Sequence, residues 1–285
     1  MSKKKKKITI NLEINKPAST LNLETKSFMQ DDSSSDKSSI DLFWDNVVEL
    51  NKLLGNITSN NAIGILLLLG YVSAVEGYFR SILSEIINIH PNSRKLNLKH
   101  NISYGAALFT KSDEVLSKFL FEEAVFASKD NIYDTIKKHL GITKGDLSNE
   151  FLKTVDDFEK VCQLRHCAVH RFGILGVKNA IKLDYDDHIN KIGKFIKLDT
   201  GNLDDISAVC TNLVKVANNN LYECILAQTV NGKNGYEWKW DLRKKDDKMI
   251  FEKYHMIFYS QYFSNLDKYS LKKQFHLFRD KFNDR

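Results

Sequence analysis

The chain has few of the residues that break helices or cross-link a fold. Its 285 residues include only two prolines and 13 glycines, so we expect a mainly helical fold with few tight turns. The cysteines Cys162, Cys167, Cys210 and Cys224 contain no CxxC pair. Their spacing matches neither a disulfide framework nor a zinc module, and reduced thiols in a cytoplasmic protein are the plain interpretation.

Long apolar runs are missing as well. The lysine run at 3–7 is not followed by an apolar stretch of signal-peptide length, so secretion is not expected. An apolar stretch at 62–75 has 14 residues before Glu76, whereas a membrane span needs roughly 20. The sequence therefore predicts a buried core helix there, no membrane partner and a cytoplasmic location.

The middle of the chain carries almost no net charge. Residues 1–40 hold eight basic against five acidic residues, residues 41–230 hold 21 against 23, and residues 231–285 hold 13 against eight. Basic ends around a near-neutral body favour a polyanionic partner such as RNA, because each neutralised phosphate releases counterions. A surplus of this size is equally expected if it serves solubility alone.

Composition divides the chain at the same places. Residues 1–40, with the polar stretch DDSSSDKSS, are predicted to be a basic, partly disordered tail. Residues 41–230 are predicted to be a helical domain. Residues 231–285 hold 13 of the 31 aromatic residues, interleaved with lysines. Such a basic aromatic-rich appendage suits a stacking platform for single-stranded nucleic acid, but it is more typical of a small core or a dimer contact.

Apolar spacing predicts the main helices of the body. They are expected at about 42–54, 61–89, 150–169 and 204–228. Shorter helices are expected between 92 and 150. After the helix at 150–169, the segments 173–185 and 191–200 alternate Ile, Val and Leu with glycine punctuation, which predicts a small β-hairpin. The predicted fold class is thus mainly α.

The helix predicted at 150–169 contains one residue that does not fit its apolar seam. The seam consists of Phe151, Val155, Phe158, Cys162 and Val169. Position 165 should continue it but is Arg165. A guanidinium on a buried stripe stays charged and is costly to desolvate unless an anion meets it. That anion is either a carboxylate, with Glu76 or Glu159 as candidates, or a phosphate in an opened cleft.

His170 follows Arg165 by five residues, which is about 140° around an ideal helix. The two side chains are therefore not neighbours by spacing alone. They converge only if the helix ends near Val169 or if two copies of the helix face each other. A histidine at a helix end is most often a C-terminal cap, but the arginine in the seam favours a functional role.

The segment RHCAVH at 165–170 resembles the signature of the HEPN superfamily: an arginine, a polar residue, three further residues and a histidine. The resemblance covers about residues 41–230. The helix predicted at 61–89 adds Glu76 and Arg80 one turn apart. They are similar to the polar pair that many HEPN proteins carry on an earlier core helix.

This resemblance implies a four- to five-helix bundle that forms a homodimer along the motif helices. It also implies an endoribonuclease that needs no metal or other cofactor, as in toxins and phage-defence effectors. Its catalytic residues would be Arg165 and His170. Supporting or RNA-binding residues would be His166, Glu76, Arg80 and Arg171. The implied partners are RNA, a second copy of the chain, and an antitoxin or regulatory protein.

The implied chemistry suits these residue types. RNA carries its own nucleophile, the 2′-hydroxyl, so the protein has to move protons and stabilise a phosphorane. Histidine can act as general base or acid near neutral pH, and arginine can donate two hydrogen bonds to the developing charge. The expected products are a 2′,3′-cyclic phosphate and a 5′-hydroxyl.

One position departs from part of the family. Some HEPN toxins have a tyrosine two residues after the histidine, where a partner nucleotidyltransferase modifies it. Here that residue is Phe172. Because phenylalanine has no hydroxyl to modify, control by that route is doubtful.

Two other interpretations remain open. Glu159, Cys162, His166 and His170 share one helical stripe, which is a spacing that metal ligands use, although ligands on one straight helix rarely surround an ion. The alternative from a different class is a HEPN-like dimer that binds RNA or a partner protein without cutting it, since fold does not determine function.

Overall fold

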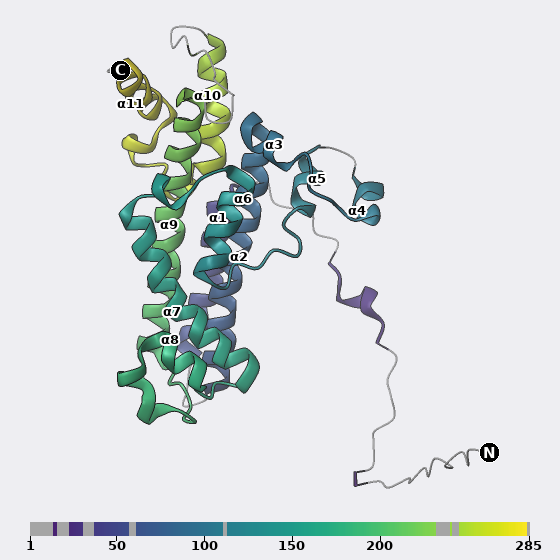
Figure 1. Cartoon of the computed structure of the whole chain (residues 1–285), viewed down its shortest axis with the longest axis vertical. Helices are drawn as coiled ribbons and strands as arrows, with labels where there is room; N and C mark the ends of the chain where they lie inside the picture. The colour runs from purple at the N-terminus through teal and green to yellow at the C-terminus, as the bar shows by residue number, and fades with distance from the viewer. Residues whose placement is uncertain are drawn as a thin grey trace, which may run out of the picture. The chain divides into compact units, whose positions relative to one another are not determined.

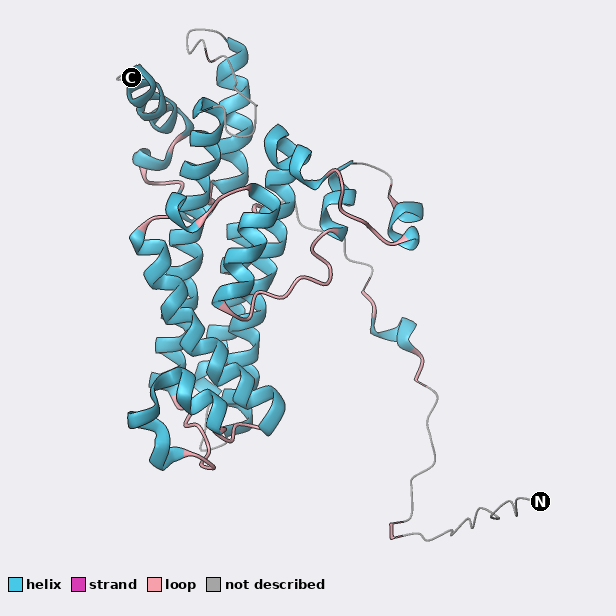
Figure 2. Ribbon diagram, viewed as in Figure 1, coloured by secondary structure: helices cyan, strands magenta, loops and turns pink. Residues whose placement is uncertain are grey.

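The structure is a computed structural model that describes residues 14–15, 23–30, 37–56, 61–110, 113–231, 240 and 245–283. The chain divides into two compact units, Met1–Asp36 and Lys37–Arg285. In the first unit a short 3₁₀ helix, η1 (Thr25–Phe28), has no buried residues. Most of the predicted tail lies outside the described residues. The second unit is mainly helical, as predicted (Figure 2).

The central helix of the second unit is α2 (Asn61–Ile89), with the bounds that the sequence predicts. Its side chains are buried around most of the circumference, as in a helix surrounded by others. The helices α1 (Ser39–Lys52), α7 (Asn149–Arg171) and α9 (Thr200–Asn231) pack against it (Figure 1). By length and composition α2 could cross a membrane, but 56% of its apolar window is buried inside the protein.

The seam of α7 is what attaches this helix to the bundle. Ser148 caps its first turn by accepting a hydrogen bond from the backbone N–H of Phe151. Phe151, Val155 and Phe158 are fully buried, and α7 packs along both α9 and α2. The predicted helical bundle is therefore present.

Shorter helices fill the chain between α2 and α7. They are α3 (Pro91–Asn97), α4 (Tyr104–Phe109), α5 (Asp113–Phe119) and α6 (Lys129–Leu140). Gly141 ends α6 in a left-handed conformation with φ 67°, which only glycine adopts without strain. Single 3₁₀ turns occur at Leu54–Asn56, Lys144–Asp146, Ile189–Lys191, Gln261–Phe263 and Asp267–Tyr269.

The β-hairpin predicted after the motif helix is wrong. Its middle is a helix, α8 (Val177–His188), and residues 173–200 contain no named strand. The two ends are joined by one antiparallel bridge, Ile174 with Phe195, and by backbone hydrogen bonds between residues 173–175 and 193–196. Asn179 of α8 is buried and donates a hydrogen bond to the side chain of Gln163 on α7 at 3.0 Å. Short apolar runs suit a strand or a helix equally, and docking on α7 selects the helix.

The C-terminal segment belongs to the same compact unit as the bundle. It contains α10 (Lys245–Phe258) and α11 (Leu271–Asn283). Three of its aromatic side chains are buried in the main core: Phe251, Tyr254 and Phe258. In addition, Asp41 of α1 accepts a hydrogen bond from the backbone N–H of Gln261 at 3.0 Å. The structure therefore shows no compact division at the predicted boundary of 230, and these aromatic residues serve the core.

Candidate active site at the end of α7

The motif occupies the last turns of α7. The helix continues through Arg171, and Phe172 ends it in a left-handed conformation with φ 48°, where its backbone N–H bonds the carbonyl of Cys167. Arg165 and His170 therefore lie within one regular helix, about 140° apart. Of the two ways in which they could converge, an early helix end is excluded. Only a second copy of the helix would bring an arginine and a histidine of this motif face to face.

The two histidines of the motif lie together. His166 and His170 are one turn apart, and their ring centroids are 4.4 Å from each other at an interplanar angle of 50°. Both side chains are exposed. The site thus presents two adjacent imidazoles to solvent, although the sequence singled out His170 more strongly than His166.

Arg165 is half-buried, and neither of its expected carboxylate partners is available to it. Glu159 accepts hydrogen bonds from the backbone N–H of Lys129 at 2.8 Å and from Gln163 at 2.7 Å. It also lies 3.7 Å from the ammonium of Lys182. Within the described part of the chain, Arg165 has no hydrogen bond or ion pair. A structural salt bridge therefore does not explain this arginine.

The second candidate, Glu76, is committed elsewhere together with Arg80. Glu76 is buried and accepts a hydrogen bond from the backbone N–H of Phe126 at 2.9 Å. Arg80 donates through Nε and Nη2 to the carbonyl of Ala124, and its guanidinium lies 3.8 Å from Glu76. This pair holds the segment 124–126 on α2. No hydrogen bond or ion pair in the described structure joins it to the motif residues.

The surroundings of His166 favour its neutral form. The pKa of His166 is lowered, first by partial burial and then by the positive charges of His170, Arg165, Lys182 and Lys178. A lowered pKa leaves this imidazole neutral at pH 7, which is the form that accepts a proton.

Two of these cations come from α8, where sequence reasoning expected a strand. Lys178 and Lys182 are four residues apart and therefore share one face of a helix. That spacing is the signal by which they could have been found. Arg171 lies at the same junction, because its Nη1 would be 2.6 Å from a side chain added at Gly176. The exposed side chain of Arg171 thus lies over Gly176 at the start of α8.

The metal interpretation finds no support in the donor geometry. Cys162 is buried, and burial raises its pKa well above the usual range, so it stays a protonated thiol. The carboxylate of Glu159 already binds a backbone N–H and a lysine. The described residues contain no group of three or more His, Cys, Asp or Glu side chains placed to hold an ion.

Comparison with known proteins found no match to this chain. No family model, no curated protein and no solved structure matches this chain. The resemblance to HEPN proteins therefore depends on the motif at 165–170 and its place at the end of a core helix.

Proposed function

We propose that this protein is a metal-independent endoribonuclease of the HEPN type that acts as a homodimer, in the manner of a toxin or phage-defence effector. One observation carries the proposal. A half-buried arginine, Arg165, has no partner in the described structure and acts electrostatically on His166, whose exposed imidazole lies beside that of His170. A desolvated guanidinium without an internal anion is suited to an external one.

The reaction needs one proton acceptor and one proton donor. A neutral imidazole takes the proton of the RNA 2′-hydroxyl, and the oxygen attacks the adjacent phosphorus. The bond from phosphorus to the 5′-oxygen breaks, and a protonated imidazole donates its proton to that oxygen. His170 carries out one of these two proton transfers, and His166 is a supporting residue beside it. Arg165 stabilises the charge on the phosphorane. The products are a 2′,3′-cyclic phosphate and a 5′-hydroxyl.

The exposed apolar residues of the motif support a homodimer. Val169 lies between Arg165 and His170 in the sequence and is 45% exposed, although the rest of its seam is buried. Phe172 at the end of the helix is 69% exposed. A second copy that covered these side chains would also bring motif arginines and histidines from the two chains together, which one regular helix does not do.

The surrounding cations support RNA as the substrate. Arg171, Lys178 and Lys182 add positive charge beside the two histidines. Cations at this density attract a phosphate backbone without reading its sequence. An antitoxin or regulatory protein would be needed to restrain such an activity in the cell.

The test is cleavage of total RNA by the purified full-length chain in EDTA, with mapping of the new ends. Wild-type protein is expected to leave 2′,3′-cyclic phosphates, and Arg165→Ala and His170→Ala are expected to remove cleavage. The matched control is His188→Ala, since His188 lies on the adjacent α8 outside the motif. Circular dichroism and light scattering verify that each variant remains folded and dimeric.

The outcomes separate the two proposed classes. Wild-type protein that binds RNA but leaves it intact would identify a binding dimer instead of a nuclease. A monomeric protein, or cleavage that survives both motif substitutions, would contradict the proposed site.

A further inference from the structure

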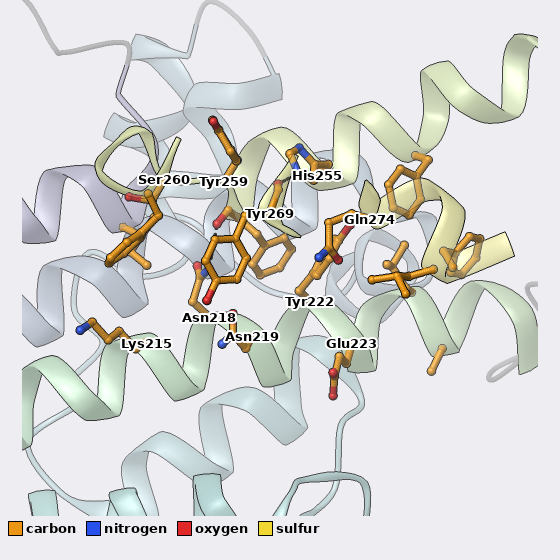
Figure 3. A pocket seen from close by; sticks show the side chains of 18 of the residues that line it. Lys215, Asn218, Asn219, Tyr222, Glu223, His255, Tyr259, Ser260, Tyr269 and Gln274 are labelled. Carbon is orange, nitrogen blue, oxygen red and sulfur yellow. Dashed lines mark hydrogen bonds between the residues drawn. The ribbon is translucent and has the colours of Figure 1, made fainter. Parts of the chain in front are cut away.

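A cavity of about 780 Å³ lies between α9 and the C-terminal helices α10 and α11 (Figure 3). These C-terminal helices are at the opposite end of the bundle from α8 (Figure 1). Small-molecule sites commonly have about 300–1,000 Å³. Side chains from α9 and from the C-terminal segment converge on this space. None of its lining residues belongs to α7 or α8, so it is distinct from the candidate active site.

His255 lines this cavity and has a hydrogen-bond acceptor without a partner. The residue is 5% exposed, and its Nε2 lies 2.9 Å from the carbonyl oxygen of Tyr269. Because a carbonyl only accepts, Nε2 must carry the hydrogen, which leaves Nδ1 of the neutral ring as an acceptor. Nδ1 is buried and has no partner among the described residues. A buried polar atom in this state calls for a donor.

Tyr222 presents a second unused group to the same cavity. Its hydroxyl is buried and likewise lacks a hydrogen-bond partner in the described part of the chain. Burial raises its pKa, so the hydroxyl stays neutral and can either donate or accept. The Tyr222 and His255 ring centroids are 6.4 Å apart. The two rings with unpaired polar atoms therefore lie next to each other in the lining of the cavity.

Much of the remaining wall is aromatic or aliphatic. His255 stacks on Tyr259 with ring centroids 5.1 Å apart, and Tyr222 packs on Phe258 at 5.2 Å. The charged residues in the lining are Lys215, Lys281 and Glu223. Because the ammonium of Lys215 already lies 4.9 Å from the centre of the Trp44 ring, one positive and one negative group remain, which do not favour a strongly charged ligand. Such a site suits a neutral ring that stacks and also forms hydrogen bonds along its edge.

We propose that this cavity binds a neutral heteroaromatic molecule of the nucleobase class. A ring N–H of the ligand donates to Nδ1 of His255, and a neighbouring atom on the same edge bonds the Tyr222 hydroxyl. Nucleobases carry donors and acceptors side by side on one flat edge, which is the pattern that these two groups require. This site is independent of the proposed ribonuclease activity and can be tested without it.

The probes are adenosine, guanosine, cytidine and uridine, titrated by calorimetry into the full-length protein. At least one is expected to bind with one site per chain. Tyr222→Phe keeps the ring and removes the hydroxyl, so it is expected to weaken that binding about fivefold. The same substitution should leave the Tm of the free protein unchanged or slightly higher, because the lost hydroxyl has no partner.

The matched control is Tyr254→Phe on the neighbouring α10. Tyr254 is also buried, but its hydroxyl lies 3.1 Å from Nδ1 of His90. This variant is expected to lower the Tm and to leave nucleoside affinity unchanged.

Two results would overturn the proposal. One is that none of the four nucleosides binds to the folded wild-type protein. The other is that Tyr222→Phe lowers the Tm and leaves the affinity unchanged, which would assign its hydroxyl to the fold.

Discussion

Histidines occupy opposite surroundings at the two ends of this bundle. At the motif end, meaning the last turns of α7 with α8, His166 and His170 are exposed beside cations. The pocket end consists of the C-terminal half of α9 with α10 and α11. His90, which precedes α3, packs against α9 and α10 there and is fully buried. Its two ring nitrogens lie 3.1 Å from Tyr254 and Gln228, and burial lowers its pKa to about 4.

The difference separates two uses of one residue type. A buried neutral imidazole with both nitrogens paired holds helices together and does not exchange protons near pH 7. An exposed imidazole can exchange protons with a substrate near neutral pH. The contrast follows from how far neighbouring helices cover each end of the bundle. The α7 seam is buried up to Cys162 and opens to solvent after it, whereas α10 and α11 cover the end of α9.

The largest effect is expected on RNA cleavage. His170→Ala should reduce the cleavage rate about 10²- to 10⁴-fold, the range for loss of a general acid or base. Tyr222→Phe at the pocket end should leave the rate in the absence of added nucleoside within about twofold. Single-turnover cleavage of one RNA by both variants measures the difference. Equal losses of cleavage rate in the two variants would contradict the assignment of cleavage to the motif end alone.

The next effect concerns the free energy of unfolding. Phe251 of α10 is 1% exposed, so Phe251→Ala should cost about 3–5 kcal/mol through the cavity that it leaves. Phe195, in the segment after α8 at the motif end, is 66% exposed, and Phe195→Ala should change stability by about 0.5 kcal/mol or less. Urea unfolding of the two variants compares them. A small loss for Phe251→Ala would separate the C-terminal segment from the core.

Stability should fall as the medium becomes acidic. An unfolded histidine takes up its proton near pH 6.5, whereas buried His90 stays neutral until about pH 4. Between these values the unfolded state binds more protons, so stability is lost as the pH falls. His90 should contribute about 2 kcal/mol of this loss from pH 7 to pH 5.

Urea unfolding at both pH values measures that contribution. The variant His90→Gln removes the titrating ring and should show a smaller loss. His139 is also buried with its pKa lowered to about 4, so part of the dependence should remain. An unchanged loss in His90→Gln would mean that His90 is protonated in the folded protein.

The smallest effect is on the titration of the motif itself. Partial burial and then neighbouring cations, among them the lysines of α8, lower the pKa of His166, so Lys178→Gln with Lys182→Gln should raise that pKa slightly. Titration of the imidazole by NMR follows this change. Lys268→Gln at the pocket end is the control and should have no effect. A constant pKa in the α8 variant would show that these two lysines do not act on His166.

Sequence reasoning was strongest where local interactions decide the structure. The bounds of α2 are those that its apolar spacing predicted. Arg165 was identified because it interrupts a seam, and this needs only periodicity. By contrast, the alternation at 173–200 was compatible with a strand or a helix, and the wrong choice hid Lys178 and Lys182.

The sequence by itself determined a helical bundle, its main helices and the unusual arginine at 165. Only the tertiary structure decided which charged groups have partners. Glu76 is occupied by a backbone N–H 50 positions away, and Asp41 by a hydroxyl 219 positions away. Such pairings depend on how distant segments pack, and local periodicity does not encode them. Packing of distant segments also made the cavity at the pocket end and left Arg165 available at the motif end.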